Sequence, residues 1–180
     1  MVGFIDARET QNLILRKLKN DDAEDLFQFR KDERMHEFTD TLPDKNLEET
    51  QSYIEKMNKG VDEGKWIIWA IEHRFTSKVI GTICLWNFNF DTSSAELGYD
   101  IHPLYQGQGL MKEALLIIIN YAFNTLSLSS LESYTEENNL KSIRLLTRCK
   151  FEVTKRVEEE GYYNQSVFRM IVYRLKREIN

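Results

Sequence analysis

The stretch Tyr105-Gln106-Gly107-Gln108-Gly109-Leu110-Met111 lies between an alternating strand pattern and the longest apolar helix pattern of the chain. Two glycines within three residues remove the Cβ atoms that would keep a ligand away from the backbone, and glycine also tolerates a positive φ. A helix that begins at such a turn leaves its first N–H groups without intrahelical partners and directs the positive end of its dipole at the turn. The stretch therefore predicts a backbone cradle for an anion, typically a phosphate. An ordinary glycine-containing turn is the alternative, and the surrounding sequence has to decide between them.

On either side of the turn, the spacing of apolar residues alternates between the periods of strands and helices. Pro103 ends the strand before the turn, because proline cannot donate a hydrogen bond to a sheet. Trp66 and Trp69 stand three residues apart in a strand pattern, so they should lie on opposite faces of the sheet. The expected strands cover residues 12–18, 66–71, 79–86, 95–101, 130–135, 151–157 and 167–175. The expected helices cover residues 21–31, 47–60, 110–123 and 138–149, and a short further piece holds Met35, His36 and Phe38.

This order of elements predicts an α+β fold (an α/β sandwich), in which a mixed sheet has helices on both faces. The 180 residues fit one domain that spans residues 1–180, because no linker or internal repeat divides them. The acidic run over residues 158–161 is expected to form the solvated tip of the last hairpin.

The composition narrows the class of protein. A formal net charge of -5 argues against a general nucleic-acid binder and is compatible with a cationic substrate such as an amine. No signal-peptide pattern opens the chain and no apolar run reaches the roughly 18 residues of a membrane span, so a soluble, cytoplasmic protein is expected. Cys84 and Cys149 lack the spacing of a disulfide framework or a metal site and should be reduced. The three histidines are not grouped with carboxylates, and no metal site is expected.

With this turn after its central strand, the chain resembles the GNAT superfamily of N-acetyltransferases. In that family the turn has Arg or Gln, two free positions, Gly, one free position and then Gly or Ala, and here Gln106, Gly109 and Met111 stand at the three fixed places. Met111 departs from the last place in the manner of the branch that resembles RimJ and RimL, the ribosomal-protein N-terminal acetyltransferases. The resemblance runs from Leu13 to Leu175 and implies a GNAT-like, mainly antiparallel central sheet.

A second motif downstream strengthens the resemblance. The family has Asn, then Ala or Ser three places on, then an apolar pair and a Gly-Phe that opens a strand. At those spacings this chain has Asn139, Ser142, Leu145, Leu146 and Phe151. Lys150 replaces the glycine. Leu146 stands where many GNAT enzymes have a tyrosine that protonates the departing thiolate, so that acid is absent and Ser142 is the nearest substitute.

The resemblance implies acetyl-coenzyme A as the donor. The glycine turn would bind the pyrophosphate through backbone amides, and the end of the central strand would offer backbone groups to the pantetheine arm. An ordinary strand end is the alternative for the latter. Asn139 would touch the pantetheine or only cap its helix. The expected coenzyme-binding residues are Asp100, Ile101, His102, Gln106, Gly107, Gln108, Gly109, Leu110, Met111, Asn139 and Ser142.

Acetyl transfer needs a neutral amine, whereas an alkyl amine with a pKa of about 10 is almost wholly protonated at pH 7. Glu96 stands where similar enzymes place a strand carboxylate that acts as general base, usually through water. A solvated strand glutamate is the alternative, and an N-terminal α-amine with a pKa near about 8 would depend on Glu96 less. Ser142 is expected to stabilise the leaving sulfur, since a hydroxyl is a poor acid, and a plain first-turn serine is the alternative.

The predicted reaction is direct transfer in a ternary complex to a primary amine, and the branch favours the N-terminal α-amine of a protein or peptide, ribosomal proteins included. The alternatives are a small amine (a polyamine, an amino acid or an amine antibiotic) and a non-catalytic sensor that binds coenzyme A. A homodimer is expected from the resemblance and from aromatic strands that are richer than one core needs. The expected acceptor-pocket residues are Met35, His36, Phe38, Trp69, Trp86, Asn87 and Tyr163.

Overall fold

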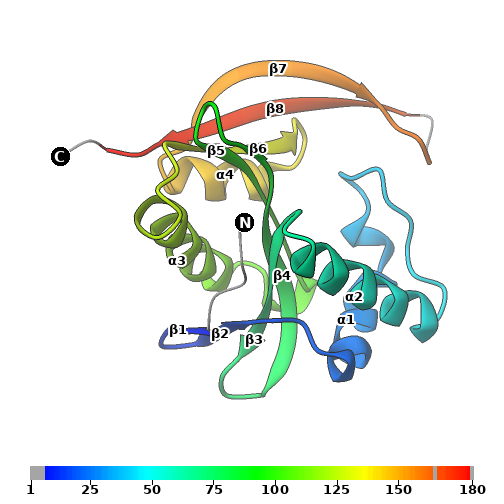
Figure 1. Cartoon of the computed structure of the whole chain (residues 1–180). Helices are drawn as coiled ribbons and strands as arrows, with labels where there is room; N and C mark the ends of the chain where they lie inside the picture. The colour runs from blue at the N-terminus through cyan, green and yellow to red at the C-terminus, as the bar shows by residue number, and fades with distance from the viewer. Residues whose placement is uncertain (1–6, 164–165, 179–180) are drawn as a thin grey trace.

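The computed structural model describes residues 7–163 and 166–178, and these form one eight-stranded sheet with two α-helices against each face (Figure 1). The strand order is β1-β2-β3-β4-β5-β6-β8-β7, and neighbouring strands are antiparallel except for β5 and β6. The strands are β1 (Arg8–Glu9), β2 (Leu13–Arg16), β3 (Ile67–His73), β4 (Lys78–Asn89), β5 (Ser94–Ile101), β6 (Ser130–Glu136), β7 (Glu152–Glu160) and β8 (Val167–Lys176). The helices are α1 (Ala23–Arg30), α2 (Leu47–Asp62), α3 (Leu110–Asn124) and α4 (Leu140–Arg148), with 3-10 turns η1 (Asn20–Asp22), η2 (Glu33–Met35) and η3 (Pro103–Tyr105). The predicted α+β fold with a mixed, mainly antiparallel sheet is confirmed.

Alternating side chains of the central strands supply two separate cores. α3 and α4 cover the core that holds Trp69, whose ring meets Tyr121 of α3 edge-on with centroids 5.5 Å apart. α1 and α2 cover the other core, which contains Ile68 of β3. Trp66 packs on this second side and donates a hydrogen bond from Nε1 to the Met57 carbonyl of α2 at 2.9 Å. The two tryptophans therefore occupy opposite faces, as predicted, and both contribute to the cores of this chain.

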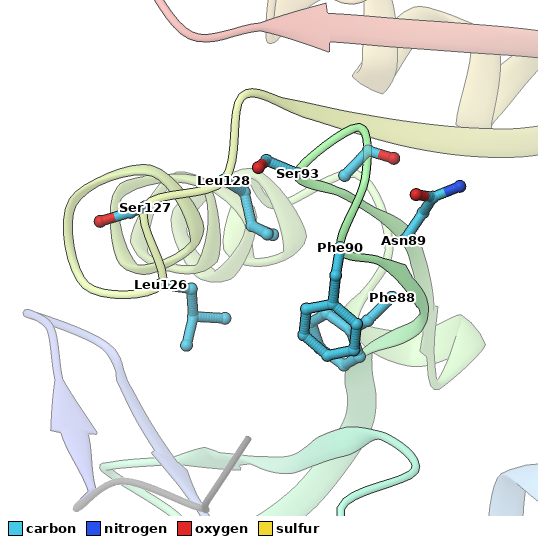
Figure 2. Close-up of a pocket in the computed structure, with 8 residues that line it drawn as sticks. Phe88, Asn89, Phe90, Ser93, Leu126, Ser127 and Leu128 are labelled. Carbon is cyan, nitrogen blue, oxygen red and sulfur yellow. The ribbon is translucent and has the colours of Figure 1, made fainter. Parts of the chain in front are cut away.

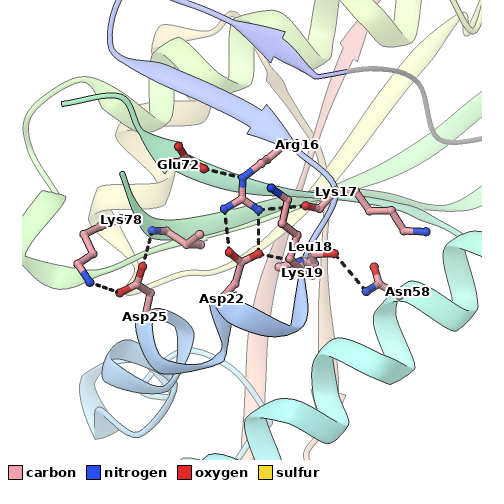
Figure 3. A network of polar contacts seen from close by, with 10 residues as sticks. Arg16, Lys17, Leu18, Lys19, Asp22, Asp25, Asn58, Glu72 and Lys78 are labelled. Carbon is pink, nitrogen blue, oxygen red and sulfur yellow. Dashed lines mark hydrogen bonds and ion pairs between the residues drawn. The ribbon is translucent and has the colours of Figure 1, made fainter. Parts of the chain in front are cut away.

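A network of charged side chains fixes the first helical segment to the sheet (Figure 3). Arg16 of β2 donates to both carboxylate oxygens of Asp22, at 2.7 and 2.8 Å, and to Glu72 of β3 at 2.5 Å. The side chains of Arg16, Asp22 and Glu72 are only 14%, 6% and 17% exposed. Buried charges are costly without a partner, so the guanidinium and the two carboxylates stabilise one another. Asp25 of α1 extends the network by accepting from the backbone N–H of Val79 in β4. These contacts place α1 against β2, β3 and β4.

The central feature of the sheet is the divergence of β5 from β6. Only Ser94–Glu96 pair with Ser130–Glu132, although β5 continues to Ile101 and β6 to Glu136. The pair is parallel and needs a crossover connection, which α3 supplies. Within the described residues, the edge of β5 beyond Glu96 therefore has no strand partner on the β6 side.

The last hairpin differs from the sequence expectation. Glu158–Glu160 belong to β7 and pair with residues 167–169 of β8, so the hairpin tip follows them instead of containing them. The acidic run fits a strand because β7 is the outermost strand of the sheet, where charged side chains remain solvated and discourage pairing with another chain. The opening strand is also shorter than expected and is preceded by β1. None of the described helices is long and apolar enough to cross a bilayer.

Candidate active site

The glycine turn between η3 and α3 is exposed to solvent, and space is open around both of its glycines. Gly107 and Gly109 have φ values of +76° and +82°, and a Cβ built on either would meet no atom within 4 Å. Gly109 is the N-cap residue of α3, so the first N–H groups of the helix lie next to it. In the part of the chain that the structure describes, none of the backbone N–H groups from residue 107 to 112 donates a hydrogen bond to another residue. The geometry thus matches the anion cradle predicted from the sequence.

Side chains around the turn hold its shape. Gln106 donates from Nε2 to the Ile101 carbonyl at 3.1 Å, and Gln108 donates from Nε2 to the Leu104 carbonyl at 2.8 Å. Lys141 of α4 donates to Oε1 of Gln106 at 2.7 Å, which places a cation beside the turn.

Leu110 and Met111 are 6% and 7% exposed, and both side chains pack into the core under α3. Only their backbone can therefore face the turn. The methionine that departs from the family pattern is a core residue, and its side chain does not enter the cradle.

The sequence interpretation assigned backbone groups of Asp100, Ile101 and His102 to a ligand, and two groups at this end of β5 have partners within the chain. The His102 N–H donates to the Ile80 carbonyl of β4 at 2.7 Å, and the Ile101 carbonyl accepts the Gln106 amide. Both groups are already engaged in holding the strand end. Backbone groups alternate in direction along a strand, so Tyr99, within the unpaired segment, directs its own groups to the β6 side.

Asp100 acts through its side chain and lies on the face covered by α1 and α2. Its Oδ1 accepts the backbone N–H of Thr82 at 2.7 Å and the Thr82 hydroxyl at 3.0 Å. Burial raises the pKa of Asp100, while the Thr82 hydrogen bonds and the charges of Arg30 and His36 oppose the shift. Arg30 lies with its guanidinium carbon 3.7 Å from the centre of the Tyr53 ring. A polar cluster thus lines the α1 and α2 side of the strand end.

On the α4 side, the structure brings together a pair of hydroxyl groups that the sequence did not indicate. Tyr99 of β5 and Ser142 of α4 are hydrogen-bonded, with 2.8 Å between Oη and Oγ. Asn139 caps α4, and its Oδ1 accepts the Ser142 N–H at 3.1 Å, in agreement with the capping interpretation. Leu146, at the usual tyrosine position, has no exposed surface. The two residues are 43 positions apart in the sequence, so no local pattern indicates their contact.

Glu96 is the last residue of β5 that pairs with β6, and its side chain lies on the same face as that of Asp100. Asn87 donates from Nδ2 to Oε1 of Glu96 at 2.5 Å, and Trp86 is the Cα partner of Glu96 across β4 and β5. The Trp86 ring covers Gly98, where an added Cβ would lie only 2.5 Å from a ring carbon. Three residues predicted for the site, Glu96, Trp86 and Asn87, are therefore neighbours on this face.

Two connections far apart in the sequence meet beside this face (Figure 1). Asp40, in the connection between α1 and α2, accepts the backbone N–H groups of Tyr162 and Tyr163 at 2.5 and 2.9 Å. His36 is held in the same connection, with its Nε2 2.8 Å from the Arg30 carbonyl. The sequence pointed to His36 and Tyr163 separately, and the structure places them on connections that touch.

The other acceptor candidates differ in exposure. Met35 packs against the core beneath α1 and α2, and Phe38 is half-buried. Trp69 is a correction, because its side chain has no exposed surface and lies in the core on the opposite face, beneath α3. The alternation of a strand that is buried on both faces does not show which side faces a ligand.

A cavity of about 110 Å³ lies elsewhere, between the β4–β5 turn and the connection from α3 to β6 (Figure 2). It is lined by Phe88, Asn89, Phe90, Ser93, Ser94, Leu126, Ser127 and Leu128. This cavity adjoins the first residue of β5, whereas the glycine turn follows the last, so the two do not form one site. Among the described residues, no group of three or more His, Cys, Asp or Glu side chains is arranged to bind a metal ion.

Comparisons with known proteins agree with this geometry. A family model described as an acetyltransferase (GNAT) domain matches residues 12–152. The "Uncharacterized N-acetyltransferase p20" of Bacillus licheniformis is 30% identical over 143 residues, which cover 79% of this chain and 80% of that protein. The "Uncharacterized N-acetyltransferase YoaA" of Bacillus subtilis is 28% identical over 165 residues, 92% of this chain and 93% of that protein.

Among solved structures, RimL, a ribosomal L7/L12 alpha-N-protein acetyltransferase in complex with coenzyme A, superposes with a TM-score of 0.84 at 16% identity, over 95% of this chain and 98% of RimL. At that identity the likeness concerns the fold. The match of the family model to most of the chain, together with the similarity to p20, shows that this chain belongs to the GNAT family of acetyltransferases.

Proposed function

We propose that this chain transfers the acetyl group of acetyl-coenzyme A directly to a primary amine within a ternary complex. The observation that supports the proposal most is the position of the open glycine turn, at the end of the β5 segment that has left β6. The turn and the unpaired strand edge are continuous in the chain. One extended ligand with a phosphate group at one end has partners along both.

The donor would be held mainly by backbone groups. The N–H groups of the turn from Gly107 to Met111 suit a pyrophosphate, and the dipole of α3 adds to their attraction. Lys141 supplies a positive charge beside Gln106. Bound acetyl-coenzyme A would supply an activated thioester. The residues present fit this group, because the inner surface of the turn has room for phosphate oxygens and donors that await a partner.

Glu96 is the proposed proton acceptor for the amine. It lies on the strand segment where β5 leaves β6, and the amide of Asn87 orients its Oε1. The second carboxylate oxygen has no partner among the described residues and is available to a water molecule or an amine. A carboxylate so placed contributes by removing the proton that the attacking nitrogen loses.

The proposed acceptor is the N-terminal α-amine of a protein or peptide. Tyr162 and Tyr163 are 84% and 56% exposed at the place where two connections meet through Asp40. Exposed aromatic rings beside an open face provide contact area for an entering peptide. The fold likeness to RimL, described as acting on ribosomal L7/L12, supports the same class.

A small cationic amine is the second candidate. Burial and the neighbouring carboxylates of Glu96, Glu132 and Glu159 raise the pKa of Tyr134. Arg174 forms an ion pair with Glu132 and opposes the shift, so Glu96 and Glu159 supply the negative charge on this face that would attract a polyamine or a similar cation. A third candidate, a sensor without activity, would bind coenzyme A and transfer nothing.

An acceptor screen separates these functions. Purified protein and acetyl-coenzyme A are incubated with peptides of varied N-termini and with small amines, and mass spectrometry detects the gain of one acetyl group. We expect acetylation of peptide N-termini, with the Glu96→Gln variant slower and the Glu152→Gln variant, at an exposed position of β7, unchanged. Tight binding of coenzyme A without any acetylated product would favour the sensor.

A homodimer and a cytoplasmic location are further proposals. The aromatic residues that suggested a second subunit, Trp66 and Trp69, pack into the two cores of this chain. The dimer is therefore supported by the family resemblance alone. A monomeric mass in sedimentation at micromolar concentration would contradict it.

A further inference from the structure

The indole ring of Trp86 fills the place of a missing side chain in β5. Gly98 lies in the segment of β5 that does not pair with β6, and a Cβ built on it would be 2.5 Å from Cζ3 and 2.6 Å from Cη2 of Trp86. A real Cβ does not come so close to another carbon, so the ring lies directly against the backbone of Gly98. Glycine at this position allows the ring to extend from β4 over β5.

Trp86 is also the cross-strand neighbour of Glu96, the proposed proton acceptor. The two residues are Cα partners, and residues directly opposite in antiparallel strands have Cβ atoms about 4.5–5.5 Å apart. A bulge follows in β4, where Asn87 has a φ of +49° and donates to Glu96, and Phe88 packs against the core beneath α3. Trp86 is therefore the last β4 side chain before the bulge on the face of Glu96, and it is half-buried. An aromatic ring and a carboxylate thus border the same exposed region.

This arrangement suits a cation. The face of an aromatic ring attracts an ammonium group, and tryptophan does so more strongly than tyrosine or phenylalanine. Glu96 adds a negative charge beside the ring. At the other end of the same face, the positive charge of Arg30 acts on Asp100 and would repel a cation. The charges therefore favour the Glu96 end of the ring for an ammonium group.

We propose that the indole of Trp86 binds the protonated amine of the acceptor and presents it to Glu96. The inference rests on the proposed function, and it identifies the group that selects an acceptor by its charge. A peptide α-ammonium and a small alkylammonium share this chemistry.

The ring contributes to binding of the acceptor and not to the chemical step. The amine arrives as an ammonium group, and Glu96 or water takes its first proton. The neutral nitrogen then forms a bond to the carbonyl carbon and is positive again until its second proton passes to water, while the carbon–sulfur bond breaks with its electron pair on sulfur. Since the ring faces a positive nitrogen before and during the transfer, Trp86→Leu should raise KM for the acceptor about tenfold and leave kcat and KM for acetyl-coenzyme A unchanged.

The test separates attraction to charge from fit of shape. Trimethylglycyl and tert-butylacetyl derivatives of one alanine tetrapeptide have the same shape, differ in a charged nitrogen against a carbon, and cannot accept an acetyl group. Choline and its tert-butyl analogue make the same comparison for a small acceptor. Isothermal titration calorimetry measures the Kd values with protein saturated with coenzyme A. We expect wild-type protein to bind the cation of at least one pair about tenfold more tightly than its neutral analogue. Trp86→Phe should lower this ratio, and Trp86→Leu should lower it to about two.

Two further variants control the experiment. Phe88→Leu makes the same kind of change in β4 on a ring that packs on the opposite face, and it should keep the wild-type ratio. Gly98→Ala keeps the indole but displaces it from its place, so it should lower the ratio as Trp86→Leu does. The double variant should resemble Trp86→Leu alone, because both changes act on the same ring.

The outcomes separate this inference from the proposed function. Equal ratios in wild-type protein, Trp86→Leu and Gly98→Ala would overturn the inference, as would a wild-type protein that acetylates an amine but shows no preference for either cation. Failure of wild-type protein to acetylate any amine would instead overturn the proposed function. If circular dichroism shows that Trp86→Leu does not fold, the ratio of Trp86→Phe decides.

Discussion

Replacing Gly109 with alanine is expected to weaken coenzyme A binding far more than it weakens the fold. Gly109 is the N-cap residue of α3, has a φ of +82°, and a Cβ there would meet no atom within 4 Å. The added methyl group therefore clashes with nothing in the protein. It occupies the space next to the N–H groups of the turn, where phosphate oxygens are proposed to lie.

The two costs of the substitution can be separated. A side chain in the left-handed conformation costs about 1–2 kcal/mol, which lowers the melting temperature of a domain of this size by roughly 2–8 °C. If the methyl group keeps a phosphate from two N–H donors, each hydrogen bond to the charged group is worth about 1.5–3 kcal/mol. The loss is then at least about 3 kcal/mol, which corresponds to a Kd raised roughly 100-fold.

Gly64 provides the matched control. It follows α2, also has a left-handed φ, of +69°, and precedes β3, whose first residue pairs with Leu85 of β4. The glycine turn follows Ile101, which pairs with Gly81, so the two glycines belong to opposite ends of the sheet. Gly64→Ala should lower the melting temperature to a similar extent and leave coenzyme A affinity unchanged. Calorimetry of unfolding and titration with coenzyme A measure both quantities, and equal affinities for the two variants would refute the cradle.

Three further substitutions test other parts of the molecule. Glu96→Gln should lower kcat by about 100-fold at pH 7. The remaining rate should rise about tenfold per pH unit up to the pKa of the acceptor amine, because only the neutral amine reacts. A pH profile of the variant that is parallel to that of wild-type protein would argue against a general base. Burial raises the pKa of Asp100, so its ionised form destabilises the folded state and stability is lost as pH rises through that pKa. Asp100→Asn keeps a hydrogen-bond acceptor for Thr82 and should remove this loss of stability at higher pH. The urea midpoint of unfolding, measured at pH 4 and at pH 7, should therefore change less in the variant than in wild-type protein. An equal change in both proteins would contradict the expectation. Arg16→Met leaves two buried carboxylates without their cation and should lower the free energy of unfolding by about 3–5 kcal/mol. Calorimetry should then show a melting temperature lower by roughly 6–20 °C. A shift of about 2 °C or less would show that the network contributes little to stability.

The glycine turn and the cap of α4 could be predicted from the sequence because their contacts are local. Gln106 reaches back five residues to Ile101, Gln108 reaches back four to Leu104, and the cap of α4 spans three residues. Each contact depends on a residue type at a short fixed spacing, which a sequence pattern records directly. The conformation of the two glycines follows from the same pattern.

The other contacts of the candidate site join residues that are distant in sequence. Tyr99 and Ser142 are 43 residues apart, and Asp40 is 122 residues from Tyr162. Periodicity indicates which way such side chains point but not what they meet. The prediction that the acidic run forms the hairpin tip was wrong for a different reason. An outermost strand and a hairpin tip are both solvated, so charge alone does not distinguish them.

The alternation of β5 would allow one strand to serve both halves of the proposed reaction. Tyr99 points to the side of α4, where it meets Ser142, while Glu96 and Asp100 point to the side of α1 and α2. The unpaired backbone edge lies between these two faces. In aminolysis of a thioester, the proton leaves nitrogen while negative charge develops on sulfur, so a base and a hydrogen-bond donor have to reach different atoms on the same carbon. A single extended strand would place the base and the donor on its two faces without any movement of the helices. The ligand would reach both only if the edge of the strand is not paired with β6. The β5–β6 ladder ends at Glu96, so the edge beyond that residue is unpaired.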